Sequence, residues 1–226
     1  MNKDQKVMDI SKKWFEESIK YEYSYHFSWL GIPIIQYPQD IIALQEIIWK
    51  VKPDLIIETG IARGGSIIFS ASLLELIGKG EVIGVDIDIK NANKKKILKH
   101  PLSKRITMIE GSSISKKTID KIKKLVQEKN KILVILDSNH THKHVLKELE
   151  IYSPLVSKNS YLIVFDTIVD DLPKQLLNNR PWGKKNNPKS AVKEFLAKNN
   201  RFRVDKGIEK KLLFTVAPMG FLKCIK

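Results

Sequence analysis

The feature that most constrains the fold is a short apolar run followed by a glycine-rich turn, at residues 54–66. Residues 55–57, Leu-Ile-Ile, form an apolar run of the kind that fills a buried parallel strand. The turn after it contains Gly60, Gly64 and Gly65, and it ends at Ser66. Glycine lets a chain turn sharply and approach a ligand closely because it has no Cβ. Since the apolar residues after Ser66 predict a helix, the turn would present free N–H groups at the positive end of a helix dipole. The sequence therefore predicts a cofactor site here.

The spacing of these glycines excludes two common phosphate-binding motifs. It is neither the G-x-G-x-x-G of dinucleotide-binding folds nor the G-x4-G-K-[ST] of a P-loop. Glu58, an acidic residue at the end of the strand, precedes the turn, and this arrangement resembles the first motif of S-adenosylmethionine (SAM) methyltransferases. A second predicted strand ends at Asp86, with Asp88 close behind. A carboxylate roughly 20 residues past the glycines can bond both ribose hydroxyls. NAD-binding folds share this feature, and a domain whose glycines only make tight turns is a further alternative.

Polar residues follow the predicted strands of this chain at corresponding positions. The strands are expected near residues 55–58, 81–86, 106–109, 132–136 and 161–165, and the residues at their ends are Glu58, Asp86, Ser113, Asp137 and Asp166. Ligands of open α/β sheets bind outside the carboxyl ends of the strands. We therefore expect one crevice that contains these side chains, with Ser112 and Ser113 beside the adenine of the cofactor.

Two of these carboxylates, Asp137 and Asp166, are expected to come from adjacent strands. Two carboxylates that meet in a crevice either share a proton or hold a cation. A bound Mg²⁺ would suit methyl transfer to a hydroxyl, because a cation acidifies the acceptor oxygen. His140 is then the best candidate for the general base. The alternatives are hydrogen bonding of Asp137 without a metal and a surface or helix-capping role for His140.

The histidines at 140, 142 and 144 suggest a different metal site. Their run resembles the H-x-H-x-D-H motif of metallo-β-lactamase-type hydrolases, but Lys143 stands where that motif has its aspartate. A zinc hydrolase is therefore a minor alternative.

Two segments outside the predicted sheet are candidates for covering the site. Residues 1–50 predict two helices joined by an aromatic stretch, which would form either a lid over cofactor or substrate or a structural strap on the core. The polar loop at 178–188 contains Arg180 and Trp182, which suit a sugar: the guanidinium for hydroxyls and the indole for the ring face. The alternative is a surface loop with Trp182 packed inward.

Length and charge limit the remaining possibilities. A chain of 226 residues is expected to form one domain, 1–226, with the core in residues 51–226. The net charge of +15 comes mainly from lysine, and no nucleic-acid-binding motif is present, so a specific nucleic-acid partner is not expected. Contact of these lysines with an anionic substrate or with an anionic membrane surface is an alternative that the sequence does not exclude. No apolar run is long enough to span a membrane, and one cysteine excludes an internal disulfide, so a cytoplasmic protein is expected. The sequence does not exclude a homo-oligomer.

The last part of the sequence predicts strands near 202–204, 212–216 and 220–225. The last two of these strands are expected to form an antiparallel hairpin at the edge of the sheet.

Seven motifs together resemble the cephalosporin hydroxylase family, which includes rhamnosyl O-methyltransferases, over most of the chain. They are 57–66, 84–88, 110–113, 136–140, 161–167, 191–196 and 215–222. The resemblance implies a Rossmann-like SAM-methyltransferase fold: an α/β three-layer sandwich whose mostly parallel sheet has an antiparallel C-terminal edge. It also implies SAM over the glycine turn and Mg²⁺ at Asp137 and Asp166, although Phe165 replaces a glutamate found in family members.

The activity implied by this resemblance is SAM-dependent O-methyl transfer to a sugar hydroxyl, in the assembly of a cell-surface polysaccharide or glycolipid. Two alternatives remain at this point. One is a SAM-binding accessory subunit that assists another enzyme without transferring a methyl group. The other is an RNA methyltransferase, which the positive charge suggests.

Overall fold

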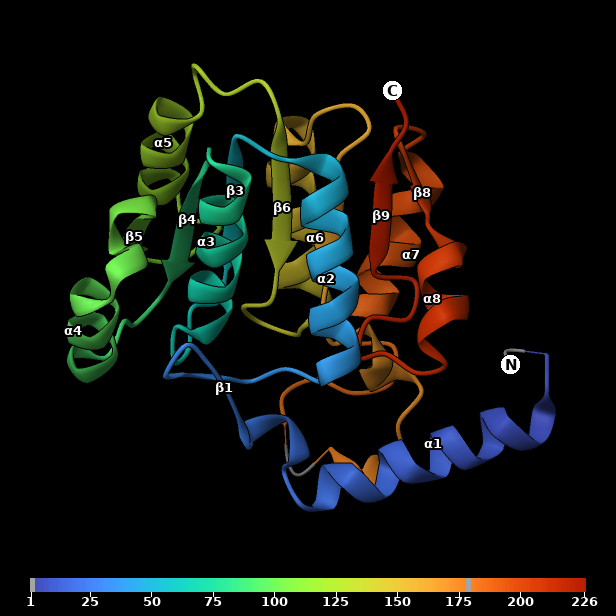
Figure 1. The fold of residues 1–226 in the computed structure, drawn as a ribbon. Coiled ribbons are helices and arrows are strands. Elements are labelled where there is room, and N and C mark those ends of the chain that lie inside the picture. The colour runs from blue at the N-terminus through green and yellow to red at the C-terminus, as the bar shows by residue number, and fades with distance from the viewer. Residues whose placement is uncertain (1–2, 178–179) are drawn as a thin grey trace.

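The protein folds as a seven-stranded sheet between two layers of helices (Figure 1). The structure is a computed structural model that describes residues 3–177 and 180–226. The strand order is β5-β4-β3-β6-β7-β9-β8, and a separate hairpin pairs β1 with β2. The predicted fold class, an α/β Rossmann-like three-layer sandwich, is confirmed. In the parts of the chain that the structure describes, no helix combines the length and the apolar character needed to cross a membrane.

Five parallel strands form the main part of the sheet: β3 (Leu55–Thr59), β4 (Glu81–Asp86), β5 (Ile106–Glu110), β6 (Ile132–Leu136) and β7 (Tyr161–Val164). At the centre, Thr59 stands opposite both Val85 and Leu136, and Leu136 stands opposite Val164. The strands therefore end at one edge of the sheet, as the sequence predicted, and the residues that follow them meet there.

The helices cover both faces of the sheet. One layer contains α2 (Pro38–Val51), α3 (Gly65–Ile77) and α8 (Lys206–Leu212), and the other contains α5 (Lys116–Leu125), α6 (His142–Tyr152) and α7 (Pro188–Lys198). The remaining helices are α1 (Gln5–Lys20), α4 (Asn91–Lys99), η1 (Tyr23–Tyr25), η2 (Pro101–Arg105), η3 (Ser153–Leu155), η4 (Thr167–Asp170) and η5 (Lys174–Leu176).

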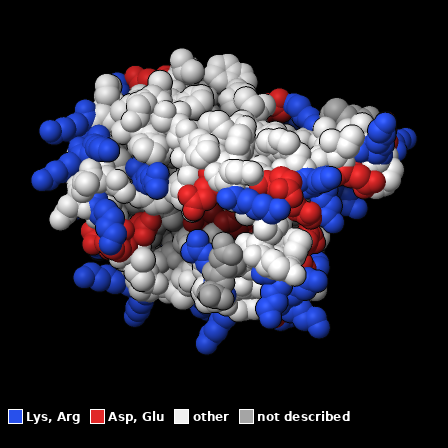
Figure 2. Space-filling model, turned by 90° about the horizontal axis from the view of Figure 1, so that it is seen from below, with Lys and Arg blue, Asp and Glu red and all other residues white. Residues whose placement is uncertain are grey.

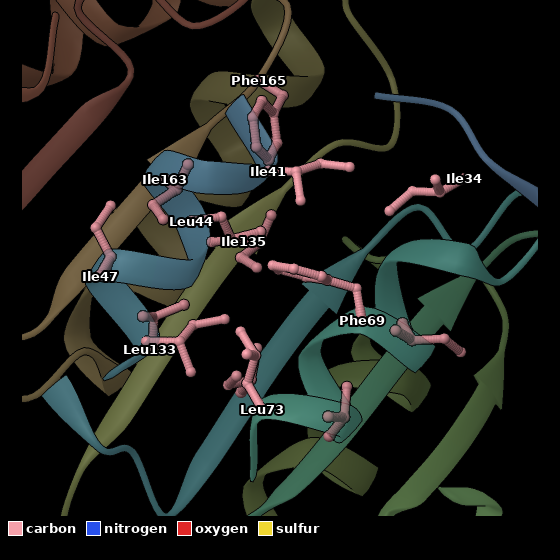
Figure 3. Packing of buried hydrophobic residues seen from close by; sticks show 14 of the residues in the cluster. Ile34, Ile41, Leu44, Ile47, Phe69, Leu73, Leu133, Ile135, Ile163 and Phe165 are labelled. Carbon is pink, nitrogen blue, oxygen red and sulfur yellow. The ribbon is translucent and has the colours of Figure 1, made fainter. Parts of the chain in front are cut away.

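Successive side chains of each strand point to opposite faces of the sheet, so the core forms two clusters, one under each layer of helices. Ile56 packs toward α2 and α3, whereas Leu55 and Ile57 belong to the cluster on the other face. Figure 3 shows the first cluster, in which the ring of Phe69 of α3 points toward Ile135 of β6, and side chains of α2 and β7 complete the packing. Phe165 is 3% exposed and belongs to this cluster, so the side chain before Asp166 is part of the core.

The N-terminal segment lies across the carboxyl ends of the strands, where α1 runs below the sheet in Figure 1. Phe15 and Ser18 form the buried side of α1, and the hydroxyl of Ser18 lies 2.9 Å from that of Tyr37. The hairpin of β1 (Phe27–Trp29) and β2 (Ile32–Ile34) packs on α3, where the indole of Trp29 donates a hydrogen bond of 3.0 Å to Ser72. The N-terminal segment therefore covers the carboxyl ends of the parallel strands, which is where ligands bind in open α/β sheets.

The antiparallel C-terminal edge is present, but the strand predicted at 212–216 is wrong. The strand β9 (Phe221–Cys224) pairs with β7 on one side and with β8 (Phe202–Val204) on the other, so neither of its edges is free for a further strand. Leu212 ends α8, and the apolar residue Phe214 packs instead against Trp14 and Phe15 of α1.

The loop before β9 is also tied to α2 through a buried carboxyl group. Asp40 is fully buried and accepts hydrogen bonds from the hydroxyl of Thr215 and from the backbone N–H of Val216. Burial raises the pKa of Asp40 to about 7. The second helix of the chain is thus fixed to a loop that lies far away in sequence.

Candidate active site

A cavity of about 410 Å³ opens between α1 and the carboxyl ends of the strands. The volume lies in the range of small-molecule binding sites. The cavity brings together most of the site residues predicted from sequence: Gly60, Gly64, Gly65, Ser66, Asp137, His140, Asp166, Arg180 and Trp182. One wall is apolar and comes from α1 and from η4, η5 and the residues around them, including Phe15, Ile19, Ile168, Leu172 and Leu176. Polar side chains, among them Glu22, Gln36 and Arg63, also line the cavity.

Asp137, His140 and Asp166 form a compact cluster at the ends of β6 and β7. The Nε2 of His140 lies 3.1 Å from an oxygen of Asp166 and 3.6 Å from an oxygen of Asp137. One donor atom from each of the three lies within 4.8 Å of the others, which is close enough for all three to hold one metal ion. Asp166 adopts a left-handed backbone conformation, with φ of 55°, which aspartate tolerates better than most residues.

The charges in this cluster are coupled. Burial alone would lower the pKa of His140, but the carboxylates of Asp166 and Asp137 raise it to about 9. Burial raises the pKa of Asp137 to about 7, against the opposing hydrogen bond from His140. The carboxylates thus hold a positive charge on the imidazole. A divalent cation among the same three groups would supply that charge instead, and carboxylate oxygens and imidazole nitrogen are both suitable ligands.

The three glycines of the turn allow other parts of the chain to pack closely. A Cβ on Gly60 would overlap the backbone carbonyl of Asp137, and one on Gly65 would overlap the backbone of β2. A Cβ on Gly64 would lie 2.6 Å from the side chain of Ile97. The sequence predicts close approach of a ligand, whereas the structure shows protein backbone and side chains against these positions, with the glycines also lining the cavity.

Glu58 and Asp86 support the turn from beneath. Glu58 is 1% exposed and accepts a hydrogen bond from the hydroxyl of Ser66, and burial raises its pKa to about 8. It is not among the residues that line the cavity. One oxygen of Asp86 accepts hydrogen bonds from the backbone N–H groups of Ile61, at 2.8 Å, and Ala62, at 3.0 Å. Both carboxyl groups therefore fix the shape of the glycine turn.

The remaining predicted cofactor residues lie outside the cavity. Ser112 and Ser113 follow β5. The hydroxyl of Ser113 lies 3.0 Å from Nε2 of His144, a residue in the first turn of α6. Asp88 is exposed and pairs with Lys90. Ser113 thus contacts α6 at the carboxyl-end side of the sheet, whereas Asp88 is on the surface.

The three neighbouring histidines do not converge. His142 lies 2.8 Å from the hydroxyl of Ser190 and 3.0 Å from a carboxylate oxygen of Glu194, so it links α6 to α7. His140 and His144 contact different groups. Within residues 3–177 and 180–226, the one cluster of metal-ligand type contains His140 alone of the three, which argues against the zinc site.

Trp182 and Arg180 lie beside the acidic cluster. The ring centroids of His140 and Trp182 are 4.8 Å apart, and the guanidinium carbon of Arg180 lies 5.5 Å from the Trp182 ring. Trp182 is partly buried and Arg180 is exposed. Trp182 therefore forms a flat wall next to the cluster, with the guanidinium over it. The predicted loop around them includes residues 178 and 179, which lie outside the described residues.

Sequence reasoning missed Gln36, whose side-chain amide donates a hydrogen bond of 3.0 Å to Asp137. No motif marks this residue. The only signal was the aromatic stretch around it, which predicted a cover over the site without identifying a polar contact.

The face that contains the opening carries mixed charge. Figure 2 shows acidic side chains gathered near the middle of this face, with lysine and arginine side chains both among them and around its rim. A continuous basic groove, which a nucleic-acid backbone would require, is not seen on this face.

Comparison with known proteins identifies relatives over nearly the whole chain. Residues 21–225 match the family model described as Rhamnosyl O-methyltransferase/CmcI. A rhamnosyl O-methyltransferase of Mycobacterium leprae (strain TN) is 32% identical over 199 residues, which cover 86% of this chain and 82% of the relative.

Solved structures share the fold at low sequence identity. An apo structure of CmcI superposes with a TM-score of 0.65 at 19% identity, covering 89% of this chain and 77% of that chain. A structure of CmcI with magnesium and SAM gives a TM-score of 0.62 at 18% identity, covering 89% and 78%. At these identities the structural similarity establishes the fold.

Proposed function

Because the chain belongs to the rhamnosyl O-methyltransferase/CmcI family, we propose that it transfers the methyl group of SAM to a sugar hydroxyl with the help of a divalent cation. The observation that carries this proposal is that one cavity contains both the glycine turn and the cluster of Asp137, His140 and Asp166. A cofactor over the turn and an acceptor at the cluster would therefore share the same space.

The cavity suits SAM on the side of the glycine turn. The turn begins α3, so its N–H groups and the helix dipole favour the carboxylate of the methionine moiety. Asp86 and Glu58 hold the turn in place, and an adenine would extend from the cavity toward Ser113, which follows β5. SAM as the cofactor agrees with the family and with the printed contents of the CmcI structure.

The residues at the other side of the cavity fit a cation and a base. Asp137 and Asp166 would hold Mg²⁺, with His140 as a third donor or as the general base. When bound, the cation lowers the pKa of the acceptor hydroxyl and offsets the developing negative charge. With that positive charge in place, the carboxylates of Asp137 and Asp166 would hold a proton on His140 less tightly, and the imidazole would be available as the base.

The reaction then needs alignment more than any further chemical group. The acceptor oxygen would form a bond to the methyl carbon as the carbon–sulfur bond of SAM breaks, and His140 would accept the hydroxyl proton. S-adenosylhomocysteine leaves. The protein contributes by holding acceptor and cofactor in line and by excluding water beneath α1.

The acceptor proposed is a sugar in a glycolipid or cell-surface polysaccharide precursor. The names of the mycobacterial relatives indicate a rhamnosyl acceptor for those proteins. In this chain, Trp182 offers a flat surface for a sugar ring, and Arg180 offers donors for its hydroxyls. The apolar walls from α1 and η4 suit the less polar parts of such an acceptor.

Calorimetry with SAM tests the cofactor assignment, with and without Mg²⁺, on the wild type and on Asp86→Ala. We expect heat of binding for the wild type and weaker binding for Asp86→Ala, because the turn loses two hydrogen bonds. Asp54→Ala, at the opposite end of β3, is the matched control and should bind SAM normally. No binding of SAM by the wild type would contradict the proposal.

Transfer from labelled SAM to rhamnosyl acceptors tests the activity itself. Labelled product is expected only with Mg²⁺ or a similar cation. Tight binding of SAM without transfer to any glycan acceptor would favour the accessory-subunit alternative instead.

A further inference from the structure

Gln36 is the one residue of the N-terminal segment with a hydrogen bond to the acidic cluster, among the contacts of the described residues. It lies between β2 and α2 and is 7% exposed. Its side-chain nitrogen donates a hydrogen bond of 3.0 Å to the Oδ2 of Asp137. A buried amide in contact with a half-buried carboxylate is a specific arrangement, since the amide has lost hydrogen bonds to water and the carboxylate replaces one of them.

The two oxygens of Asp137 have different partners. Oδ2 accepts the hydrogen bond from Gln36, whereas Oδ1 faces His140 at 3.6 Å. The amide thus determines which oxygen is directed into the cluster. We propose that Gln36 is a positioning residue of the cation site, which holds the Asp137 carboxylate in the orientation that presents Oδ1 to the cation. This inference rests on the proposed function.

A neutral amide is suited to this role because of the charges already present. The cluster contains two carboxylates and an imidazole. An amide donates a hydrogen bond without adding charge, whereas a lysine or arginine at position 36 would compete with the cation for the carboxylates. Hydrogen-bonded partners behind metal ligands commonly orient the ligand in this way.

The backbone around Gln36 is fixed on both sides. Ile34 and Tyr37 are 2% and 4% exposed, and Tyr37 is joined to α1 through Ser18. Ile34 also lies against Gly65, where a Cβ would overlap its backbone. Because β2 is packed directly on the start of α3, the backbone that leads to Gln36 is anchored against the glycine turn. The N-terminal segment is therefore part of the site and not only a cover over it.

Manganese binding tests this role without relying on catalysis. Gln36→Met keeps the length and volume of the side chain but removes the donor. We expect its dissociation constant for Mn²⁺, measured by electron paramagnetic resonance without SAM, to rise about 10-fold, the size typical of partners that orient metal ligands. SAM affinity without metal should change less than about twofold. In steady-state assays the half-saturating Mg²⁺ concentration should rise, while kcat at saturating Mg²⁺ changes much less.

Gln39→Met is the matched control, because Gln39 lies three positions later, in the first turn of α2, and has no hydrogen bond to Asp137 among those of the described residues. It should bind Mn²⁺ like the wild type. If Gln36→Met does not fold, Gln36→Asn withdraws the donor from Asp137 and should show the same loss.

Wild-type affinity for Mn²⁺ in either folded Gln36 variant would overturn the inference and leave the proposed function intact. A wild-type protein that binds SAM but no Mn²⁺ would overturn both the cation role and this inference.

Discussion

Gly60 packs directly against the backbone of Asp137, so closely that a Cβ at position 60 would overlap the Asp137 carbonyl. The backbone N–H of Asp137 in turn donates a 2.9 Å hydrogen bond to the carbonyl of Thr59, the residue before that glycine. The turn expected to bind the cofactor and the cluster expected to bind the cation are therefore built on the same contact. A change to one is transmitted to the other.

Gly60→Ala is expected to destabilise the protein by about 3 kcal/mol or more, because it adds an overlap to an unfavourable left-handed φ of 93°. Denaturant unfolding measures this loss, and SAM and Mn²⁺ affinity should fall together. Gly78→Ala is the control: φ is 84° there, but nothing lies within 4 Å of the added Cβ. It should cost only about 1 kcal/mol. Equal losses for both variants would contradict the packing argument.

Asp166→Asn is expected to lower kcat about 100-fold or more, since a cation contributes several kcal/mol to such reactions. Asparagine tolerates the left-handed backbone at this position, where φ is 55°, so the melting temperature should change little. The variant should also bind Mn²⁺ more weakly than the wild type. Full activity with wild-type metal affinity would exclude Asp166 as a ligand.

Trp182→Ala is expected to raise the KM for the sugar acceptor about 10-fold, while the affinity for SAM is unchanged, because the ring forms a wall beside His140. Trp49→Ala is a suitable comparison, since Trp49 lies exposed on α2, away from the cavity lining. A similar rise in KM for the acceptor in both variants, or a loss of SAM binding in Trp182→Ala, would contradict a role of Trp182 in binding the acceptor.

Asp40 is expected to make stability depend on pH. Its pKa is raised by burial to about 7, compared with an ordinary value near 4, so the folded protein binds this proton more tightly than the unfolded chain does. The stabilisation is present at low pH and is lost as pH rises from about 4 to about 7.

Asp40→Asn removes the titration while keeping an acceptor for the Val216 N–H. The difference in free energy of unfolding between this variant and the wild type should therefore shift in favour of the variant by up to about 4 kcal/mol between pH 4 and pH 8. Denaturant unfolding at several pH values measures it, and Glu58, whose pKa is also raised, contributes equally to both proteins. A difference that does not change with pH would contradict the expectation.

Much of the sheet was predictable because its strands are short apolar runs bounded by polar residues. The run at 132–136 was predicted with the bounds that β6 has, and Asp137 follows it at the predicted edge. Such runs are buried on both sides, so local sequence alone identifies them. The meeting of Asp137 and Asp166 then followed from adjacent parallel strands.

The contacts between distant segments were not predictable. The apolar residues at 212–216 look like a strand, yet Phe214 packs on α1 and Thr215 bonds Asp40. Gln36 meets Asp137 across 101 residues of sequence. Neither pairing follows a period or a motif, because each depends on how the N-terminal segment folds over the finished sheet. Hydrophobic pattern defines elements but not their partners at such distances.

The position of β9 has a consequence during synthesis. This strand is made after β7 and β8 but lies between them. Until residues 221–224 leave the ribosome, the apolar strand β7 has an unpaired edge, which is a template for strand addition by another chain. A nascent chain that stalls before Phe221 is therefore expected to aggregate more readily than a chain in which β9 has paired with β7.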